Sequence, residues 1–208
     1  MPEAPPVWSP PEGAEPKATG EAGFADAASA VFWPVRTKAQ YGRTVCFEKA
    51  GGGYVGVPNG KGGITTQDRH FLALRDKGAR YHVGIDLFGD PHDLIVAIES
   101  GVVLNWHFFY HGVYKLFVQC DSGLVINYGE VDKVSESEFK LKAGKRIVAG
   151  QPIARIGRMS GGGHMLHFEM YPKGIKDNQH HHPKDSPHNL AKFKNAAQYL
   201  VALARNGK

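Results

Sequence analysis

Apolar and polar residues alternate along much of the segment from 81 to 171, as in strands that bury one face of a sheet. The stretches YHVGIDLF and HMLHFEMY alternate with a period of two, and LIVAIESGVVLNW is a longer β-prone run. VYKLFVQC and LVINYGEV flank Asp121-Ser122-Gly123, a sequence typical of a hairpin turn. Short strands at this spacing, without an internal repeat, predict a mainly β fold built as a compact antiparallel sheet or sandwich.

The two ends of the chain lack this alternation. Residues 1–28 contain six prolines and few apolar residues, which predicts a disordered, Pro-rich leader. The β domain is then expected over 29–175, with its first strand near 32–35. Residues 176–208 are expected to form a polar loop followed by a C-terminal α-helix, with Asn189 as its N-cap.

Composition narrows the classes of function. Gly and Pro make up 26 and 13 of the 208 residues, which favours many turns over a helical bundle. No run approaches about 18 apolar residues, so we expect no membrane span. The net charge is only +5 and the basic residues are scattered, so we expect no nucleic-acid partner. We also expect the protein to be a monomer. Cys46 and Cys120 fit two buried thiols, or a disulfide if their strands are neighbours.

The segment His82-Val83-Gly84-Ile85-Asp86 carries the first candidate ligands. On a strand, His82, Gly84 and Asp86 share one face, because side chains alternate between the faces. A straight strand would hold His82 and Asp86 about 13 Å apart, at about 3.3 Å per residue. They can share one ion only if the strand bends, and Gly84 is where a bend is easiest. Imidazole and carboxylate together suit zinc.

A second segment, His164 to Tyr171, carries the third candidate. Leu166, Phe168 and Met170 form its core face, so His167 projects to the opposite face. If the two strands are neighbours, His82, Asp86 and His167 form a site of two imidazoles and one carboxylate, with a fourth position open for water. Each motif alone also has an ordinary interpretation: HxxxD fits a hydrogen-bonded surface pair, and HxxH fits a helix.

The order RYHVGIDLFG, VAIESGVV, GLVINYGEV, AGQPIARIG and LHFEMY resembles the lysostaphin/LytM-like zinc metallopeptidases. The resemblance implies the lysostaphin-type β fold, with zinc (Zn2+) bound by His82, Asp86 and His167. It also implies the activity of a metallo-endopeptidase that hydrolyses peptide bonds in bacterial peptidoglycan. Such an enzyme acts in the periplasm or cell wall, yet no signal peptide is visible at the N-terminus. We therefore expect delivery by phage lysis or by a secretion system, or a trimmed signal, with an immunity or delivery protein as partner of a secreted effector.

The chain departs from the family pattern at the assisting histidines. The family usually has HxH at the end of the second motif, and Met165 stands at the place of its first His, with His164 one residue earlier. The family's Tyr-x-His segment here ends in Glu130. Glu130 is our first choice as catalytic base, ahead of His164 and Glu169. By alternation Glu130 shares a face with Tyr128, which leaves a salt bridge at the strand end as its other role, and His164 faces the core.

Further residues are candidates for the walls of the groove. We expect His107, Tyr110 and His111 to contact substrate, in a groove lined by the loops around 50–63, 107–114 and 158–164. Segment 66–80 fits a short helix or an ordered loop. The stretch His180-His181-His182 is expected to be solvated and to bind metal only adventitiously.

Two other functions are compatible with the sequence. One is a catalytically impaired, zinc-containing module that binds or regulates the cell wall. The other is a structural domain stabilised by its metal.

Overall fold

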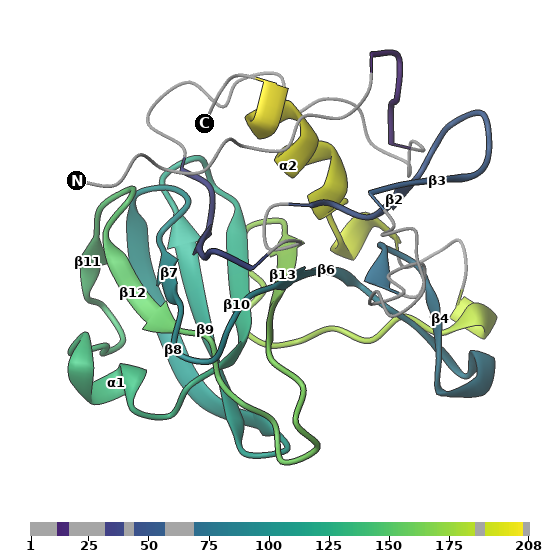
Figure 1. Cartoon of the computed structure of the whole chain (residues 1–208). Helices are drawn as coiled ribbons and strands as arrows, with labels where there is room; N and C mark the ends of the chain where they lie inside the picture. The colour runs from purple at the N-terminus through teal and green to yellow at the C-terminus, as the bar shows by residue number, and fades with distance from the viewer. Residues whose placement is uncertain (1–11, 17–31, 40–43, 57–68, 186–189, 206–208) are drawn as a thin grey trace.

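The computed structural model describes residues 12–16, 32–39, 44–56, 69–185 and 190–205, and within them strands dominate (Figure 1). The main sheet has six antiparallel strands in the order β11-β8-β9-β10-β13-β6. Their bounds are β6 Gly84–Phe88, β8 Gly101–Tyr110, β9 Val113–Cys120, β10 Val125–Val131, β11 Arg146–Ile147 and β13 Met165–Tyr171. The mainly β, antiparallel architecture expected from the sequence is confirmed.

Smaller sheets complete the fold. A three-stranded sheet has the order β1-β7-β12, and the pairs β2-β3 and β4-β5 form two further ribbons. These strands are β1 Val35–Arg36, β2 Phe47–Glu48, β3 Tyr54–Val55, β4 Leu74–Arg75, β5 Arg80–Tyr81, β7 Leu94–Val96 and β12 Pro152–Arg155. The helices are α1 Ser135–Glu138 and α2 Ala196–Arg205, with 3-10 turns η2 Asp76–Gly78, η3 Pro183–Asp185 and η4 Leu190–Lys192.

The strands β6, β10 and β13 are buried on both faces, and the two faces differ in chemistry. One face carries the core side chains, which include Ile85, Tyr128, Leu166, Phe168 and Met170. The other face carries the polar and ionisable residues predicted from the alternation. In the register of β13 against β6, His167 pairs with Asp86. The two candidate motifs therefore lie on neighbouring strands, as the metal hypothesis requires.

The C-terminal helix is confirmed but is shorter than expected. Asn189 lies outside the described residues, and the helix begins at Ala196, where the Asn195 side chain accepts a hydrogen bond of 2.9 Å from the Ala197 N–H. The preceding backbone is kept out of the helix by a β-bridge between Lys194 and Met170. From Ala196 onward α2 packs against β6 and β13 (Figure 1).

The expectation of a fully disordered leader is wrong for residues 12–16. Ala14 is 7% exposed and belongs to the hydrophobic core, and Pro16 forms a β-bridge with Lys49. Glu15 pairs with Arg205 at 2.6 Å, which ties this segment to the end of α2. A short stretch of small and polar residues can pack where a helix end offers it charge and hydrogen-bonding partners. The rest of 1–28 lies outside the described residues.

The histidine stretch is not uniformly solvated, and here the sequence-based expectation is wrong. His181 is 1% exposed and packs between Tyr81 and Phe193, with ring centroids 5.0 and 5.7 Å from its own. Its carbonyl accepts a hydrogen bond of 2.8 Å from the Tyr81 N–H. His180 and His182 flank it, and His180 is exposed. The imidazole of His181 is thus buried against the aromatic rings of Tyr81 and Phe193.

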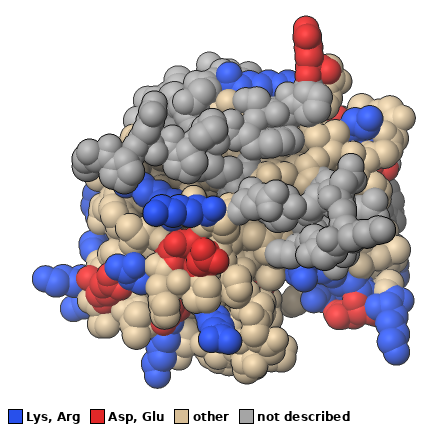
Figure 2. All heavy atoms as spheres, in the orientation of Figure 1, with Lys and Arg blue, Asp and Glu red and all other residues tan. Residues whose placement is uncertain are grey.

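Other expectations concern thiols, charge and membranes. Cys46 and Cys120 are both buried as thiols and are not joined in a disulfide, and burial raises the pKa of the Cys120 thiol well above its ordinary value. On the face shown in Figure 2, Lys and Arg side chains are interspersed with Asp and Glu. Among the described helices, none is long and apolar enough to cross a membrane.

Candidate metal centre

The three candidate ligands converge on one point beside the β6–β13 pair. His82 Nε2 lies 3.1 Å from His167 Nδ1 and 3.2 Å from Asp86 Oδ1, and His167 Nδ1 lies 2.8 Å from the same carboxylate oxygen. All three side chains are buried, with exposed fractions of 3 to 8%. Around a tetrahedral zinc ion with bonds of about 2.0–2.1 Å, two ligand atoms are separated by about 3.3 Å. The observed triangle is close to this size.

His82 reaches this point because it precedes β6 rather than continuing it. Its backbone N–H and C=O bond to the segment before β4, with the N–H bonded to Ala73 O at 2.7 Å. Gly84 makes the approach possible, since a Cβ there would lie 2.9 Å from Cε1 of His167 and 3.0 Å from Cγ of Glu169. Any larger residue at Gly84 would displace the His167 ring from the centre.

Each of the two imidazoles uses its outer nitrogen to donate a hydrogen bond, which leaves its inner nitrogen as the one that can bind a metal ion. His82 Nδ1 lies 3.0 Å from the carbonyl oxygen of His70, so it is the nitrogen that donates. His167 Nε2 lies 2.8 Å from Glu169 Oε1 and donates in the same way. His82 Nε2 and His167 Nδ1 are then the nitrogens that would offer lone pairs to a bound metal ion, together with the Asp86 oxygen. Three acceptors around one point need a cation between them.

Asp86 is held by its second oxygen. Arg69 and Arg75 donate to Asp86 Oδ2 over 3.1 and 3.2 Å, which leaves Oδ1 for the centre. Arg69 also contacts the sulfur of Met165 at 3.6 Å. Each candidate ligand therefore has its outer atom bound by a fixed partner, an arrangement typical of residues that coordinate metal ions.

The electrostatics also favour a cation at this point. Burial alone would raise the pKa of Asp86, but His82 and His167 hold it well below its usual range. Burial alone would lower the pKa of His167, but Glu169 and Asp86 raise it to about 10. Burial lowers the pKa of His82. Without a metal, a proton on His167 supplies the positive charge, and a divalent ion would take its place. The residues present thus fit zinc.

Glu130 enters the same pocket through a β-bulge. The register of β10 against β9 shifts between Gly129 and Val131, and Glu130 has a φ of 62°. Such a conformation costs a non-glycine residue about 1–3 kcal/mol. Alternation placed Glu130 on the face of Tyr128, whose hydroxyl lies in the core and accepts a hydrogen bond of 3.0 Å from the Ile98 N–H. That placement is wrong, because the bulge turns Glu130 to the polar face.

The carboxyl of Glu130 is only partly hydrogen-bonded. It is 3% exposed, and Oε1 accepts a hydrogen bond from the Tyr110 hydroxyl. Within the described part of the chain, no protein group bonds to Oε2. Burial, reinforced by the negative charge of Asp86, raises the pKa of Glu130 to about 7. A buried carboxyl oxygen that faces a pocket without a protein partner is available to a water molecule or a substrate group.

This raised pKa predicts a pH-dependent stability of the metal-free protein. The pKa rises from 4.5 to about 7 on folding, so protonated Glu130 stabilises the fold below pH 4.5, and this stabilisation is lost as the pH rises through 7. In Glu130→Gln the loss should disappear. The variant should gain up to about 3 kcal/mol over the native protein between pH 4.5 and pH 8, in urea unfolding at a series of pH values. Parallel pH curves for the two proteins would contradict the assignment.

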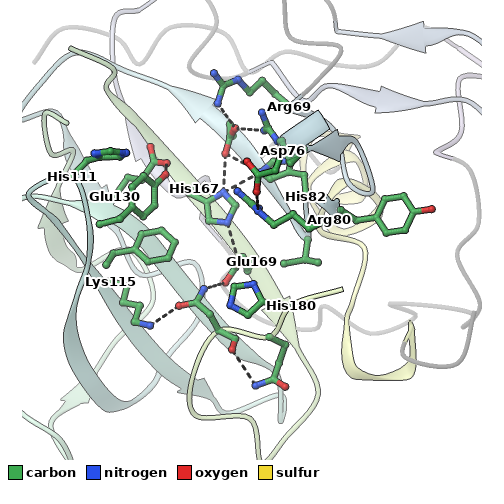
Figure 3. A pocket seen from close by; sticks show the side chains of 18 of the residues that line it. Arg69, Asp76, Arg80, His82, His111, Lys115, Glu130, His167, Glu169 and His180 are labelled. Atoms are coloured by element: carbon green, nitrogen blue, oxygen red, sulfur yellow. Dashed lines mark hydrogen bonds and ion pairs between the residues drawn. The ribbon is translucent and has the colours of Figure 1, made fainter. Parts of the chain in front are cut away.

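The pocket around these groups has a volume of about 860 Å³. Of the predicted groove residues, Tyr110 and His111 line it; Glu130 and His111 lie together on one side of His167, with His82 and Arg80 on the other (Figure 3). His107 and His164 are not among its lining residues. Residues 57–63 of the first predicted loop lie outside the described residues, and the 158–164 loop does not line the pocket.

His164 is turned away from the centre. Its Nδ1 lies 2.5 Å from the carbonyl oxygen of Gly89, next to the end of β6. The sequence interpretation allowed His164 to reach the metal only through a bulge after the glycines at 161–163. The strand instead begins at Met165 and alternates regularly from there, with Leu166 paired to Leu87.

Several pocket residues were missed from the sequence. Arg69 and Arg75 come from the segment that fitted either a short helix or an ordered loop; Arg69 lies in the turns before β4, and Arg75 is the last residue of β4. Lys115 reaches the pocket from β9 and bonds to Asp177 and Asn178 at 2.5 and 2.6 Å. Asn178 in turn donates to Glu169 at 2.7 Å, so the loop after β13 contributes to holding His167. The signal available was the concentration of arginines in RHFLALRDKGAR.

Comparison with known proteins agrees with the geometry. Residues 80–181 match the sequence profile of peptidase family M23. The chain is similar to the catalytic domain of the antimicrobial peptidase lysostaphin from Staphylococcus simulans, with 22% identity and a TM-score of 0.41 over 50% of this chain and 77% of that one. It is also similar to a mutant of the catalytic domain of the prophage-encoded M23 protein EnpA from Enterococcus faecalis, with 21% identity and a TM-score of 0.39 over 63% and 97%.

A third similar structure is that of a zinc-containing peptidase from Vibrio cholerae, with 20% identity and a TM-score of 0.37; it covers 61% of this chain, which spans 43% of that one. No curated protein sequence matches the chain. The resemblance to lysostaphin/LytM-like peptidases is confirmed at the level of the family, because residues 80–181 match peptidase family M23.

Proposed function

We propose that this protein is a zinc-dependent endopeptidase that hydrolyses peptide bonds in bacterial peptidoglycan. The observation that carries the proposal is the convergence of three potential ligand atoms, from His82, Asp86 and His167, beside a carboxyl oxygen of Glu130 that lacks a partner among the described residues. Zinc bound there would polarise the scissile carbonyl and make water a stronger nucleophile. The match of residues 80–181 to peptidase family M23 supports peptidoglycan as the substrate class.

The chain's own residues have distinct roles in this proposal. Glu130 accepts a proton from the attacking water through Oε2 as the water oxygen adds to the carbonyl carbon, and then returns the proton to the departing amine nitrogen. His70 and Glu169 orient the two imidazoles through their outer nitrogens. The burial of the cluster keeps bulk water away from the charges that develop in the reaction.

Location and partners follow from the substrate. The protein would act in the periplasm or cell wall, as an antibacterial effector or a lysin. It would reach its substrate through phage lysis, through a secretion system, or after removal of a signal. An effector of this kind would have a delivery protein or an immunity protein as partner. We propose that the chain consists of a leader, a β domain and a C-terminal loop with a helix. We also propose that the protein is a monomer.

One observation favours a second candidate function. Met165 replaces the family's assisting histidine, and its sulfur contacts Arg69, so no imidazole stands at that position. The same zinc site could then serve a module that binds or regulates the cell wall without cutting it. The two functions differ in turnover, which the purified protein can decide.

The experiment uses purified peptidoglycan sacculi and the zinc-loaded full chain. We expect the turbidity of the suspension to fall as cross-links are cut, and the fall to be prevented by a chelator and restored by added zinc. A binding module would instead sediment with the sacculi while the turbidity stayed constant. Sedimentation at constant turbidity would contradict the endopeptidase proposal and support the wall-binding module.

A further inference from the structure

Two β-bulges bring Tyr110 and Glu130 together across an intervening strand. β8 and β10 both pair with β9, and their registers against it shift between Phe108 and Tyr110 and between Gly129 and Val131 respectively. Residues on strands two positions apart in a sheet are about 10 Å apart at the backbone. The Tyr110 and Glu130 side chains together span this distance, and the Tyr110 hydroxyl donates to Glu130 Oε1. Bulges are common next to active sites, where they redirect side chains.

This contact makes the two oxygens of Glu130 unequal. Oε1 is occupied by the Tyr110 hydroxyl, whereas Oε2 has no hydrogen-bond partner among the described residues. Burial and the neighbouring Glu130 raise the pKa of Tyr110 far above its ordinary value, so the hydroxyl keeps its proton and acts as the donor. Stability alone would not favour a buried, half-bonded carboxyl on a backbone with positive φ.

We propose that Tyr110 is a positioning residue, which fixes the rotation of the Glu130 carboxyl so that Oε2 alone receives the proton. The inference rests on the proposed function, because it gives Glu130 the role of base. It also changes the expectation for Tyr110, whose hydroxyl is directed at Glu130 rather than being free for substrate. Donation to Oε1 additionally favours the ionised form of the carboxyl, which is the form that accepts a proton.

A purely structural role for the Tyr110 hydroxyl is disfavoured by the other contacts of the hairpin. The β8–β9 ladder runs from Gly101 to Tyr110, and the hairpin tip is anchored by a hydrogen bond of 3.0 Å from the Ser160 N–H to the carbonyl of His111. These backbone contacts hold the hairpin without the side chain. Removal of the hydroxyl should therefore leave the fold intact and change the behaviour of Glu130.

The test compares Tyr110→Phe with Tyr114→Phe, which removes a hydroxyl from the facing strand of the same hairpin. In Tyr110→Phe we expect kcat for peptidoglycan hydrolysis to fall about tenfold with KM unchanged, and the acid limb of the pH profile to move up by about one unit, as for the loss of a hydrogen bond to a charged group. Tyr114→Phe should match the native protein. Adding Tyr110→Phe to Glu130→Gln should cause little further loss, because the two residues act as one unit.

A readout without catalysis separates this inference from the function on which it rests. In the metal-free protein with carbon-13 in its glutamate carboxyls, NMR should show the Glu130 midpoint at a higher pH in Tyr110→Phe than in the native chain. A rise in KM with unchanged kcat and pH profile would assign Tyr110 to substrate contact and overturn the proposal. If the native protein does not cut peptidoglycan, the proposed function fails, and an unmoved NMR midpoint would then overturn the role of Tyr110 as well.

Discussion

Replacement of Glu130 by glutamine should slow hydrolysis of peptidoglycan peptides by about 10²–10⁴-fold while zinc stays bound, as is typical for the loss of a general base. The side chain keeps its shape and its acceptor for Tyr110, but it can no longer take a proton. Glu130 touches none of the outer atoms that hold His82, Asp86 and His167, so the metal affinity should be retained. The measurement is the initial rate of release of soluble wall fragments, with the zinc content determined on the same samples.

The control is His164→Ala, which removes the other candidate base. Its imidazole is directed at the Gly89 carbonyl rather than into the pocket, so we expect a loss of less than about threefold, on the scale of a substitution away from the reacting atoms. The opposite result, near-normal activity in Glu130→Gln and none in His164→Ala, would mean that the segment after Gly163 rearranges and that the base has been assigned wrongly.

The second large effect concerns the metal. In Asp86→Asn, and in His167→Gln, the affinity for zinc should fall by more than about 10²-fold, because the loss even of a ligand's hydrogen-bonding partner usually costs about 10–100-fold. Elemental analysis after dialysis should give about one zinc per native chain and much less in either variant. The melting temperature of the metal-free proteins checks that each variant still folds, which matters for Asp86 because its buried carboxylate pairs with both Arg69 and Arg75.

Two controls make the zinc measurement specific. Asp76→Asn removes another carboxylate that lines the pocket, but one that is exposed and pairs with Arg80 at 2.5 Å, so this variant should keep its zinc. The comparison is made with His180 and His182 replaced by glutamine throughout, since these outer imidazoles could bind metal adventitiously. Equal zinc content in Asp86→Asn and Asp76→Asn would place the ion somewhere other than the predicted centre.

The positions of Asp86 and His167 were predictable because they depend on alternation along two strands, which directs His167 away from Leu166 and Phe168. His82 was predicted on the same face as Asp86, but it lies before β6 and is held by backbone hydrogen bonds to the segment before β4. The only further condition was that the two strands be neighbours, and the pairing of His167 with Asp86 meets it. The role of Gly84 was also visible, although its missing side chain makes room for the His167 ring rather than only for an ion.

The features that were missed depend on local departures from alternation and on contacts distant in sequence. The bulge at Glu130 turns its side chain to the face opposite to the one that a regular strand would give it. No residue type in VINYGEV predicts a positive φ at a glutamate. The attachment of Arg69 and Arg75 to Asp86 requires the β4-β5 ribbon to fold back over β6, which local pattern does not encode. The late start of α2 likewise follows from the bridge between Lys194 and Met170.

The most direct test of the account is mass spectrometry of peptidoglycan peptides after incubation with the zinc-loaded native chain, Glu130→Gln and Asp86→Asn. The account predicts new peptide fragments, each larger by one water across a cut amide bond, with the native protein alone. Glu130→Gln should yield only traces while retaining zinc, and Asp86→Asn should yield none. Native protein that holds one zinc at His82, Asp86 and His167 but leaves every cross-link intact would contradict the endopeptidase function and leave a zinc-containing wall-binding module in its place.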